Sequence, residues 1–323
     1  MKRLAVAGIL CVLAAGGAVA QQSYPNQTIT FIVPFAAGGP SDVLARLFAQ
    51  SFTKTLGRQV IVENVTGAGG TIGAVRVARA KPDGYTLLFS QVSGLAPIAA
   101  YYKQPPYDAA RDFDPVARVA DVPFIILTRK DAPVNNVKEF VQWVKANDAK
   151  LNFGTGGVGA VSPGLVVLNS ALGTRVTGIA YRGTSLALQD LVAGNIDFMV
   201  DQPISALGQI KSGAVKAIAV MSDRRSAALP DLPTAAEGGL ANVEHNVWNG
   251  ILAPKGTPTI VIDRLYSAVA TAFGDDFVKQ RMAALGAEQP VGEASKPGPF
   301  RTFIQSEINR WVQMMRAAGV VPE

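Results

Sequence analysis

Residues 28–52, TITFIVPFAAGGPSDVLARLFAQSF, decide the fold that we predict for this chain. The β-forming residues 30–33 predict a strand that ends at Pro34. A glycine pair, a proline and a serine then suit the start of a helix, and apolar residues at helical spacing continue it to Gly57. A glycine-rich turn from strand to helix leaves backbone N–H groups unpaired, and the helix dipole adds to their positive field. Residues 34–42 are therefore predicted to bind an anion rather than to form a merely flexible turn.

Asp42, in the first turn of that helix, has two possible roles. It can cap its own helix, which is the commoner use of an aspartate at this place. It can instead accept a hydrogen bond from a ligand hydroxyl, an ammonium group or a water molecule. The sequence leaves both roles open.

The first 20 residues have the pattern of an export signal. Lys2 and Arg3 precede an uncharged run that ends in a small-x-small site at residues 18–20. A membrane anchor is the alternative, but the run is short for a membrane span and rich in alanine and glycine. Cleavage would leave a chain that begins at Gln21 and lacks cysteine, because Cys11 is the only one. That chain would have neither a disulfide nor a thiol nucleophile.

Length and charge favour a two-lobed protein that binds a small molecule. At 323 residues the chain is near the limit for a single hydrophobic core, so two lobes are expected. The formal net charge of +6 is spread along the chain without a basic run, so we expect no nucleic-acid partner. A mild positive charge suits a small anionic ligand.

Strands and helices alternate along the chain with short loops, as in α/β proteins with mostly parallel sheets flanked by helices. Residues 116–120 and 124–129, separated at 121–123, are expected to cross into a second lobe, and a strand at 247–253 to return. In such a fold the strand-to-helix loops face one another across a cleft, where ligands bind. The predicted boundaries are residues 21–122 with 247–323 for the first lobe and 123–246 for the second.

A second glycine-rich loop follows the strand predicted before Gly154. Gly154, Gly156 and Gly159 match the dinucleotide pattern G-x-G-x-x-G, which alone is a weak signal. A dinucleotide site also needs an acidic residue about twenty positions later. Residues 150–189 contain no Asp or Glu, so we expect no cofactor, although the loop still offers N–H groups at a helix start. A third stretch, residues 67–73, suits close helix–sheet packing as well as it suits ligand contact.

The residues that enzymes use most often are scarce. His245 is the only histidine, and the chain has no G-x-S-x-G motif for a nucleophilic serine. No group of His, Cys and carboxylate residues has the spacing of metal ligands, so no metal is expected. A lone histidine is more often structural than catalytic, and we predict that the protein is not an enzyme.

Four segments resemble one family in order and spacing. They are VPFAAGGPSDVLARL at 33–47, VENVTGAGGTIGAVRVARAKPDGYTLL at 62–88, YRGTSLALQDLVAGNIDFMVDQP at 181–203 and LPDLPTAAEGG at 229–239. The chain is similar here to the extracytoplasmic solute receptors of tripartite tricarboxylate transport systems, the Bug family. The resemblance implies a type II-like periplasmic binding protein with two α/β lobes and two crossing strands. It also implies that two strand-to-helix loops grip a ligand carboxylate, partly through ordered water.

The resemblance further implies which residues line the cleft. The first loop would contribute Phe35, Ala36, Ala37, Gly38, Gly39, Ser41 and Asp42. The opposing loop would contribute Thr155, Gly156, Gly159, Ala160, Val161 and Ser162. Gln91 and Ser93 would lie on the rim, and Tyr181 and Asp201 would line the side of the second lobe. The family often has Ser at the position of Ala160 and His near Pro163, and here Pro163 and Gly164 are expected to interrupt the helix start.

The function implied is that of a monomeric periplasmic solute-binding protein, exported by its N-terminal signal. It would deliver a small organic carboxylate to membrane transporter subunits and perform no chemistry. Dicarboxylates, tricarboxylates, acidic amino acids and aromatic acids all fit a loop that holds one carboxylate. The alternatives are a receptor that feeds a signalling system and a periplasmic enzyme that acts on a carboxylate.

Overall fold

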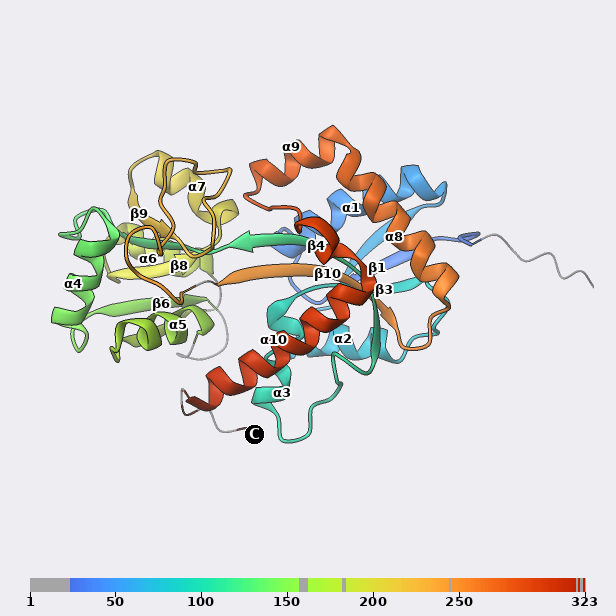
Figure 1. Ribbon diagram of the computed structural model, residues 1–323, viewed down its shortest axis with the longest axis horizontal. Coiled ribbons are helices and arrows are strands. Elements are labelled where there is room, and N and C mark those ends of the chain that lie inside the picture. Colours follow the sequence, from blue (N-terminus) through green and yellow to red (C-terminus); the bar gives the residue numbers. More distant parts are fainter. Residues whose placement is uncertain are drawn as a thin grey trace, which may run out of the picture.

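The structure, a computed structural model, describes residues 24–156, 162–181, 184–243, 245–317, 319 and 322. Two five-stranded sheets flanked by helices form two lobes (Figure 1). The predicted two-lobed α/β fold is therefore confirmed, whereas the proposed signal at residues 1–20 lies outside the described residues. Within the described part of the chain, no helix is long and apolar enough to cross a membrane.

The first sheet has one strand that runs against the other four. Its strands, in the order in which they pair, are β2 (Val60–Asn64), β1 (Ile29–Val33), β3 (Thr86–Gln91), β10 (Asn246–Pro254) and β4 (Phe113–Pro123). β1 pairs in parallel with β2 and β3, and β10 is antiparallel to β3 and β4. Because β10 alone has the opposite direction, the expectation of a mostly parallel sheet holds.

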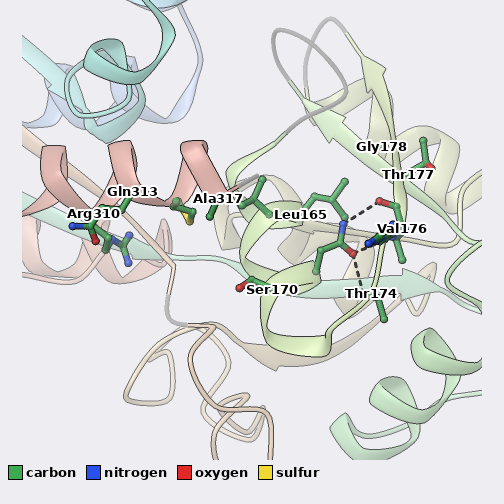
Figure 2. A pocket seen from close by; sticks show the side chains of 13 residues that line it. Leu165, Ser170, Thr174, Val176, Thr177, Gly178, Arg310, Gln313 and Ala317 are labelled. Carbon is green, nitrogen blue, oxygen red and sulfur yellow. Dashed lines mark hydrogen bonds between the residues drawn. The ribbon is translucent and has the colours of Figure 1, made fainter. Parts of the chain in front are cut away.

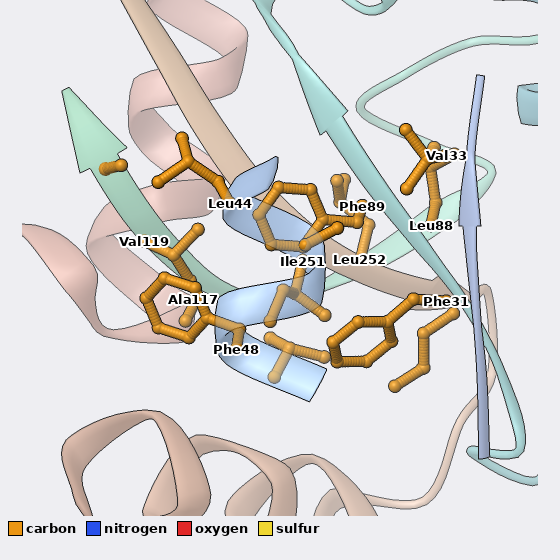
Figure 3. Packing of buried hydrophobic residues seen from close by; sticks show 14 of the residues in the cluster. Phe31, Val33, Leu44, Phe48, Leu88, Phe89, Ala117, Val119, Ile251 and Leu252 are labelled. Carbon is orange, nitrogen blue, oxygen red and sulfur yellow. The ribbon is translucent and has the colours of Figure 1, made fainter. Parts of the chain in front are cut away.

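Helices from both ends of the chain cover this sheet. They are α1 (Pro40–Leu56), α2 (Thr71–Ala78), α3 (Ile98–Tyr101), α8 (Thr259–Gly274), α9 (Asp276–Ala284) and α10 (Pro297–Ala317), with 3-10 turns η1 (Ala68–Gly70), η2 (Val92–Gly94) and η3 (Gly292–Ser295). α1 begins at the predicted proline and is closed by Gly57, whose φ of 68° is left-handed. Its apolar stripe buries Phe48 against Phe89, with ring centroids 6.2 Å apart, and Phe31 lies 6.0 Å from Phe89 (Figure 3).

The second sheet repeats the same arrangement. Its strands pair in the order β7 (Thr177–Tyr181), β6 (Asn152–Gly156), β8 (Phe198–Asp201), β5 (Ile125–Arg129) and β9 (Val215–Val220). β6 is parallel to β7 and β8, while β5 is antiparallel to β8 and β9. The flanking helices are α4 (Val137–Asn147), α5 (Pro163–Leu172), α6 (Thr184–Ala193) and α7 (Pro203–Lys211). In both sheets, therefore, the single antiparallel strand is fourth in the order.

Both faces of the second sheet are buried along β5. Along β5, Ile126 packs in one apolar cluster with Phe153 and Phe198, whereas Ile125 and Leu127 pack in another. This alternation follows from the period of two in a strand, and it requires helices on both sides.

The chain crosses between the lobes without the break predicted at residues 121–123. These residues belong to β4, where Asp121 pairs with Trp248 of β10 and with the backbone of Glu288. Pro123 fits in β4 because β4 is the edge strand of its sheet, where a missing N–H donor is tolerated.

His245 belongs to the crossing region. Its ring stacks on Phe124 at 4.6 Å and 8°, and its carbonyl accepts from the Phe124 N–H at 3.2 Å. Burial, together with the charge of Arg310, lowers the pKa of His245 to about 3. The imidazole is therefore neutral and packed between the lobes, in keeping with the structural role expected of it.

Candidate functional site

The loop between β1 and α1 is shaped by the buried carboxylate of Asp42. Its Oδ2 accepts hydrogen bonds from the Gly38 N–H at 2.9 Å and from Arg46 Nε at 3.0 Å. Its Oδ1 accepts from Asn64 Nδ2 at 3.0 Å. Burial alone would raise the pKa of Asp42, but these three hydrogen bonds lower it below its usual value. Asp42 therefore stays ionised and holds the loop, and both of its oxygens are occupied by donors of the chain itself.

Asn64, at the end of β2, was missed in the sequence. Besides its bond to Asp42, its Nδ2 donates to the Phe35 carbonyl at 3.0 Å, and its Oδ1 accepts from Arg46 Nη2 at 3.2 Å. It thus connects both ends of the loop. Its role depends on the register of β2 against β1, in which Asn64 pairs with Val33, and the sequence alone does not show that register.

The middle of this loop offers free donors. Ala36, Ala37 and Gly38 are exposed, and the hydrogen bonds of the described residues give the Ala36 and Ala37 N–H groups no acceptor. The Gly39 N–H closes the turn on the Ala36 carbonyl at 3.2 Å. Two free N–H groups beside the N-terminus of a long helix form a site suited to an anion.

Ser41 faces the sheet. Its hydroxyl lies 3.2 Å from Oδ1 of Asn249 on β10, and both residues are buried. This hydrogen bond fixes the first turn of α1 to the strand that returns from the second lobe. Ser41 therefore has a partner within the protein, as Asp42 has.

Phe35 is half-buried and packs between two glycines. A Cβ at Gly70 would lie 3.5 Å from its ring, and a Cβ at Gly94 would lie 3.3 Å from it. Gly73 is tighter still, because its Cβ would come within 2.7 Å of the Val65 carbonyl oxygen. Of the two roles considered for residues 67–73, the structure thus supports close packing.

The opposing loop is described only at its two ends. Thr155 and Gly156 end β6, and Ser162 caps α5 by accepting the Leu165 N–H at 3.2 Å. The predicted site residues Gly159, Ala160 and Val161 lie outside the described residues.

The helix after this loop starts differently from our expectation. Pro163 does not interrupt α5 but is its first residue, where a proline loses no hydrogen bond because that N–H would have no helical partner. Gly164 is required by packing, since a Cβ there would lie 2.4 Å from Val200 Cγ2.

Tyr181 and Asp201 are the last residues of β7 and β8, and they lie at the same end of the second sheet. Tyr181 is the register partner of Gly156, and its hydroxyl donates to Asp190 Oδ2 at 2.6 Å. Burial and the Asp190 carboxylate raise the pKa of Tyr181 to about 12. Its hydroxyl proton is therefore committed to Asp190, so only the oxygen lone pairs are available to another group.

Asp201 differs from Tyr181 because part of its side chain is buried without a partner. It is 2% exposed, its Oδ1 accepts the Gln202 N–H at 2.8 Å, and its Oδ2 has neither a partner nor solvent contact. Burial raises the pKa of Asp201 to about 6, although the hydrogen bond from the Gln202 N–H opposes this. Oε1 of Gln202 is likewise buried and unpartnered. Two adjacent acceptors therefore lack donors at the carboxyl end of β8.

The rim residues differ from each other. Gln91 ends β3 with its Oε1 buried and unpartnered, whereas Ser93 is exposed. The hydrogen bonds given above for Ser41, Asp42, Ser162, Tyr181 and Asp201 each join two residues of the same lobe. Each group of residues is thus assembled within its own lobe.

A separate cavity lies between the two lobes at the end of α10. It has a volume of about 880 Å³, and Arg310, Gln313 and Ala317 of α10 face α5 and the start of β7 across it (Figure 2). None of the predicted site residues lines it. In the part of the chain that the structure describes, no group of three His, Cys, Asp or Glu residues could hold a metal ion.

Comparison with known proteins identifies relatives over nearly the whole chain. The family described as tripartite tricarboxylate transporter family receptor matches residues 44–320. A UPF0065 protein from the TAR-I ttuE-ttuC' intergenic region of Agrobacterium vitis is 42% identical over 303 residues, which cover 94% of this chain and 87% of the relative. Protein BugT of Bordetella pertussis is 34% identical over 321 residues, covering 98% and 97%.

Solved structures agree in fold. The periplasmic binding protein BugD superimposes with a TM-score of 0.80 and 42% identity, covering 93% of this chain and all of its own. MatC from Rhodopseudomonas palustris, solved with bound malate, gives 0.78 and 38%, covering 90% and 99%. An R. palustris protein with adipate gives 0.80 and 30%, covering 93% and 100%. The chain therefore belongs to the tripartite tricarboxylate transporter receptor family and is a solute receptor of the Bug type.

Proposed function

We propose that this receptor captures a small organic carboxylate between its two lobes in the periplasm and delivers it to the subunits of a membrane transporter. The observation that carries the proposal is the pair of free N–H groups at Ala36 and Ala37. They lie at the positive end of α1, and the bonds of Asp42 and Asn64 hold their loop in place. The malate and adipate named for the similar structures support a carboxylate as the ligand class.

In this mechanism the two lobes sample open and closed arrangements, and the ligand stabilises the closed one by touching both. The moving units are the lobes at residues 21–122 with 247–323 and at residues 123–246. Residues 1–20 direct export and are then removed. The first loop takes the carboxylate through its backbone, so Asp42 acts by holding the loop rather than by touching the ligand.

A panel of carboxylates tests the proposal. We expect one or more of malate, adipate, citrate, aspartate and benzoate to raise the melting temperature of the protein and to give saturable heat in a calorimetric titration. The matched controls are the fully amidated compounds, in which every carboxylate is replaced by an amide, so that the carbon skeleton is kept but the negative charge is lost. The proposal is wrong if no carboxylate binds, or if an amide binds as tightly as its acid.

A further inference from the structure

The residues that follow α9, at positions 286–288, contact both lobes. On the side of the first lobe, Ala287 is buried in the apolar core. The N–H and the carbonyl of Glu288 exchange two hydrogen bonds with the backbone of Asp121 in β4, each of 2.8 Å. These bonds make the segment a fixed part of the first lobe.

Gly286 brings the same segment against the second lobe. A Cβ at this position would lie 2.4 Å from Cβ of Pro203, the first residue of α7, and 3.6 Å from Cβ of Ala228. Figure 1 shows the connection after α9 approaching α7 between the two lobes. A side chain at Gly286 therefore requires Pro203 or the turn at residue 286 to shift.

An ion pair joins the lobes beside this contact. Arg224, which follows β9 in the second lobe, donates from Nε to Glu288 Oε2 at 2.6 Å. The carboxylates of Glu288, Asp223 and Asp121 together raise the pKa of Arg224 although its partial burial lowers it. A cavity of about 210 Å³ lies alongside, and its lining includes Asp121, Arg224 and Glu288.

We propose that residues 286–288 with Arg224 form an interlobe latch that sets the angle between the two lobes. The latch acts next to the candidate site, because Pro203 comes directly after the unpartnered acceptors of Asp201 and Gln202. The latch residues are positioning residues: they do not touch the ligand but fix the fraction of molecules whose lobes are correctly placed. The apparent dissociation constant varies inversely with that fraction. This effect on affinity rests on the proposed function, whereas the effect on the lobe angle does not.

The lobe angle can be measured without a ligand. Spin labels at Lys211→Cys on α7 and Gln280→Cys on α9 report the distance between the lobes, in a chain produced from residue 21 onward and so without Cys11. We expect Gly286→Ala to lengthen the distances. Gly292→Ala is the matched control, because Gly292 has a similar left-handed φ, 57° against 64°, but nothing within 4 Å of a Cβ. If Gly286→Ala and Gly292→Ala give the same distances as the parent, the latch does not exist.

The ion pair is tested by titration with malate and adipate. We expect Arg224→Gln and Glu288→Gln each to weaken binding roughly two- to fivefold, as for a half-exposed ion pair, and the double variant to be no weaker than either. Arg225→Gln is the control, since Arg225 pairs with Glu237 inside the second lobe at 2.9 Å. Additive losses, or a loss equal to that of Arg225→Gln, would contradict the latch. If Gly286→Ala shifts the distances while no carboxylate binds the parent, the latch stands and the proposed function fails.

Discussion

Asp42→Ala is the sharpest single perturbation of the first loop. It removes three hydrogen bonds, of 2.9, 3.0 and 3.0 Å, from one buried carboxylate. A hydrogen bond to a charged group contributes about 1.5–3 kcal/mol, and an exposed ion pair contributes less than about 1 kcal/mol. The Arg46 side chain is 53% exposed and Gly38 can turn to water, so the losses do not add fully. We expect the free energy of unfolding to fall by about 2–3 kcal/mol in urea denaturation.

The loss should depend on pH in a definite direction. Because the folded protein lowers the pKa of Asp42, its stabilisation is fully present above the unfolded pKa of about 3.9. The stabilisation is lost as pH falls through the lower folded pKa. The difference between the parent and Asp42→Ala should therefore be constant near neutral pH and shrink below about pH 4.

Binding should weaken as well, because the Ala36 and Ala37 N–H groups lose the bonds that fix their direction. Restoring order to one or two residues costs about 1–2 kcal/mol each, so we expect at least roughly fivefold weaker binding in calorimetric titration. Asp276→Ala is the matched control: Asp276 also lies in the first turn of a helix and pairs with a lysine, but its side chain is 84% exposed. If both variants unfold and bind like the parent, the loop is not held by Asp42 and our reasoning is refuted.

Three other changes test the remaining groups. Asp201→Asn should raise the free energy of unfolding at pH 7 by about 2 kcal/mol, because burial raises the pKa of Asp201 to about 6 and its charged form destabilises the folded state. In urea titrations this gain in stability should disappear below about pH 4. The parent should lose free energy of unfolding as pH falls from about 6.5 toward 3, because the unfolded state takes up a proton on His245 over that range and the folded state does not. His245→Phe should not show this loss. Gly164→Ala should lower the melting temperature through a destabilisation of about 1–3 kcal/mol against Val200, whereas Gly208→Ala, in a helix with open space around it, should not lower it. An equal effect of the two alanines would contradict the packing that we describe.

The sequence predicted α1 almost to the residue, because its limits depend on local chemistry. A proline fits the first helical position, and a glycine with positive φ fits the residue after the last. The same rule was not applied at Pro163, where a proline at a helix start was interpreted as an interruption. The predicted break at residues 121–123 failed for a different reason. Those residues gain their strand partners from β10 and Glu288, which are far along the chain and invisible to a local pattern.

The candidate site was predictable only in part. Its position at the carboxyl ends of parallel strands followed from the alternation of strands and helices. The partners of Asp42 did not, because the approach of Asn64 depends on the register of β2 against β1. The contact of Gly286 with Pro203 was equally hidden, since one glycine in a turn carries no sign of what it touches.

The buried carboxylates of Asp42 in the first lobe and Asp201 in the second lobe differ in their hydrogen bonding. Both residues are 2% exposed, but Asp42 receives three hydrogen bonds and has a lowered pKa, whereas Oδ2 of Asp201 receives no hydrogen bond. A buried acceptor without a donor costs free energy, so folding alone gives no reason to keep one. Because that oxygen is also shielded from solvent, a donor from water or ligand can reach it only after the second lobe moves. Pro203, held against Gly286, lies where such a movement begins. We therefore expect access to Oδ2 of Asp201 to depend on the angle between the lobes, which the latch sets.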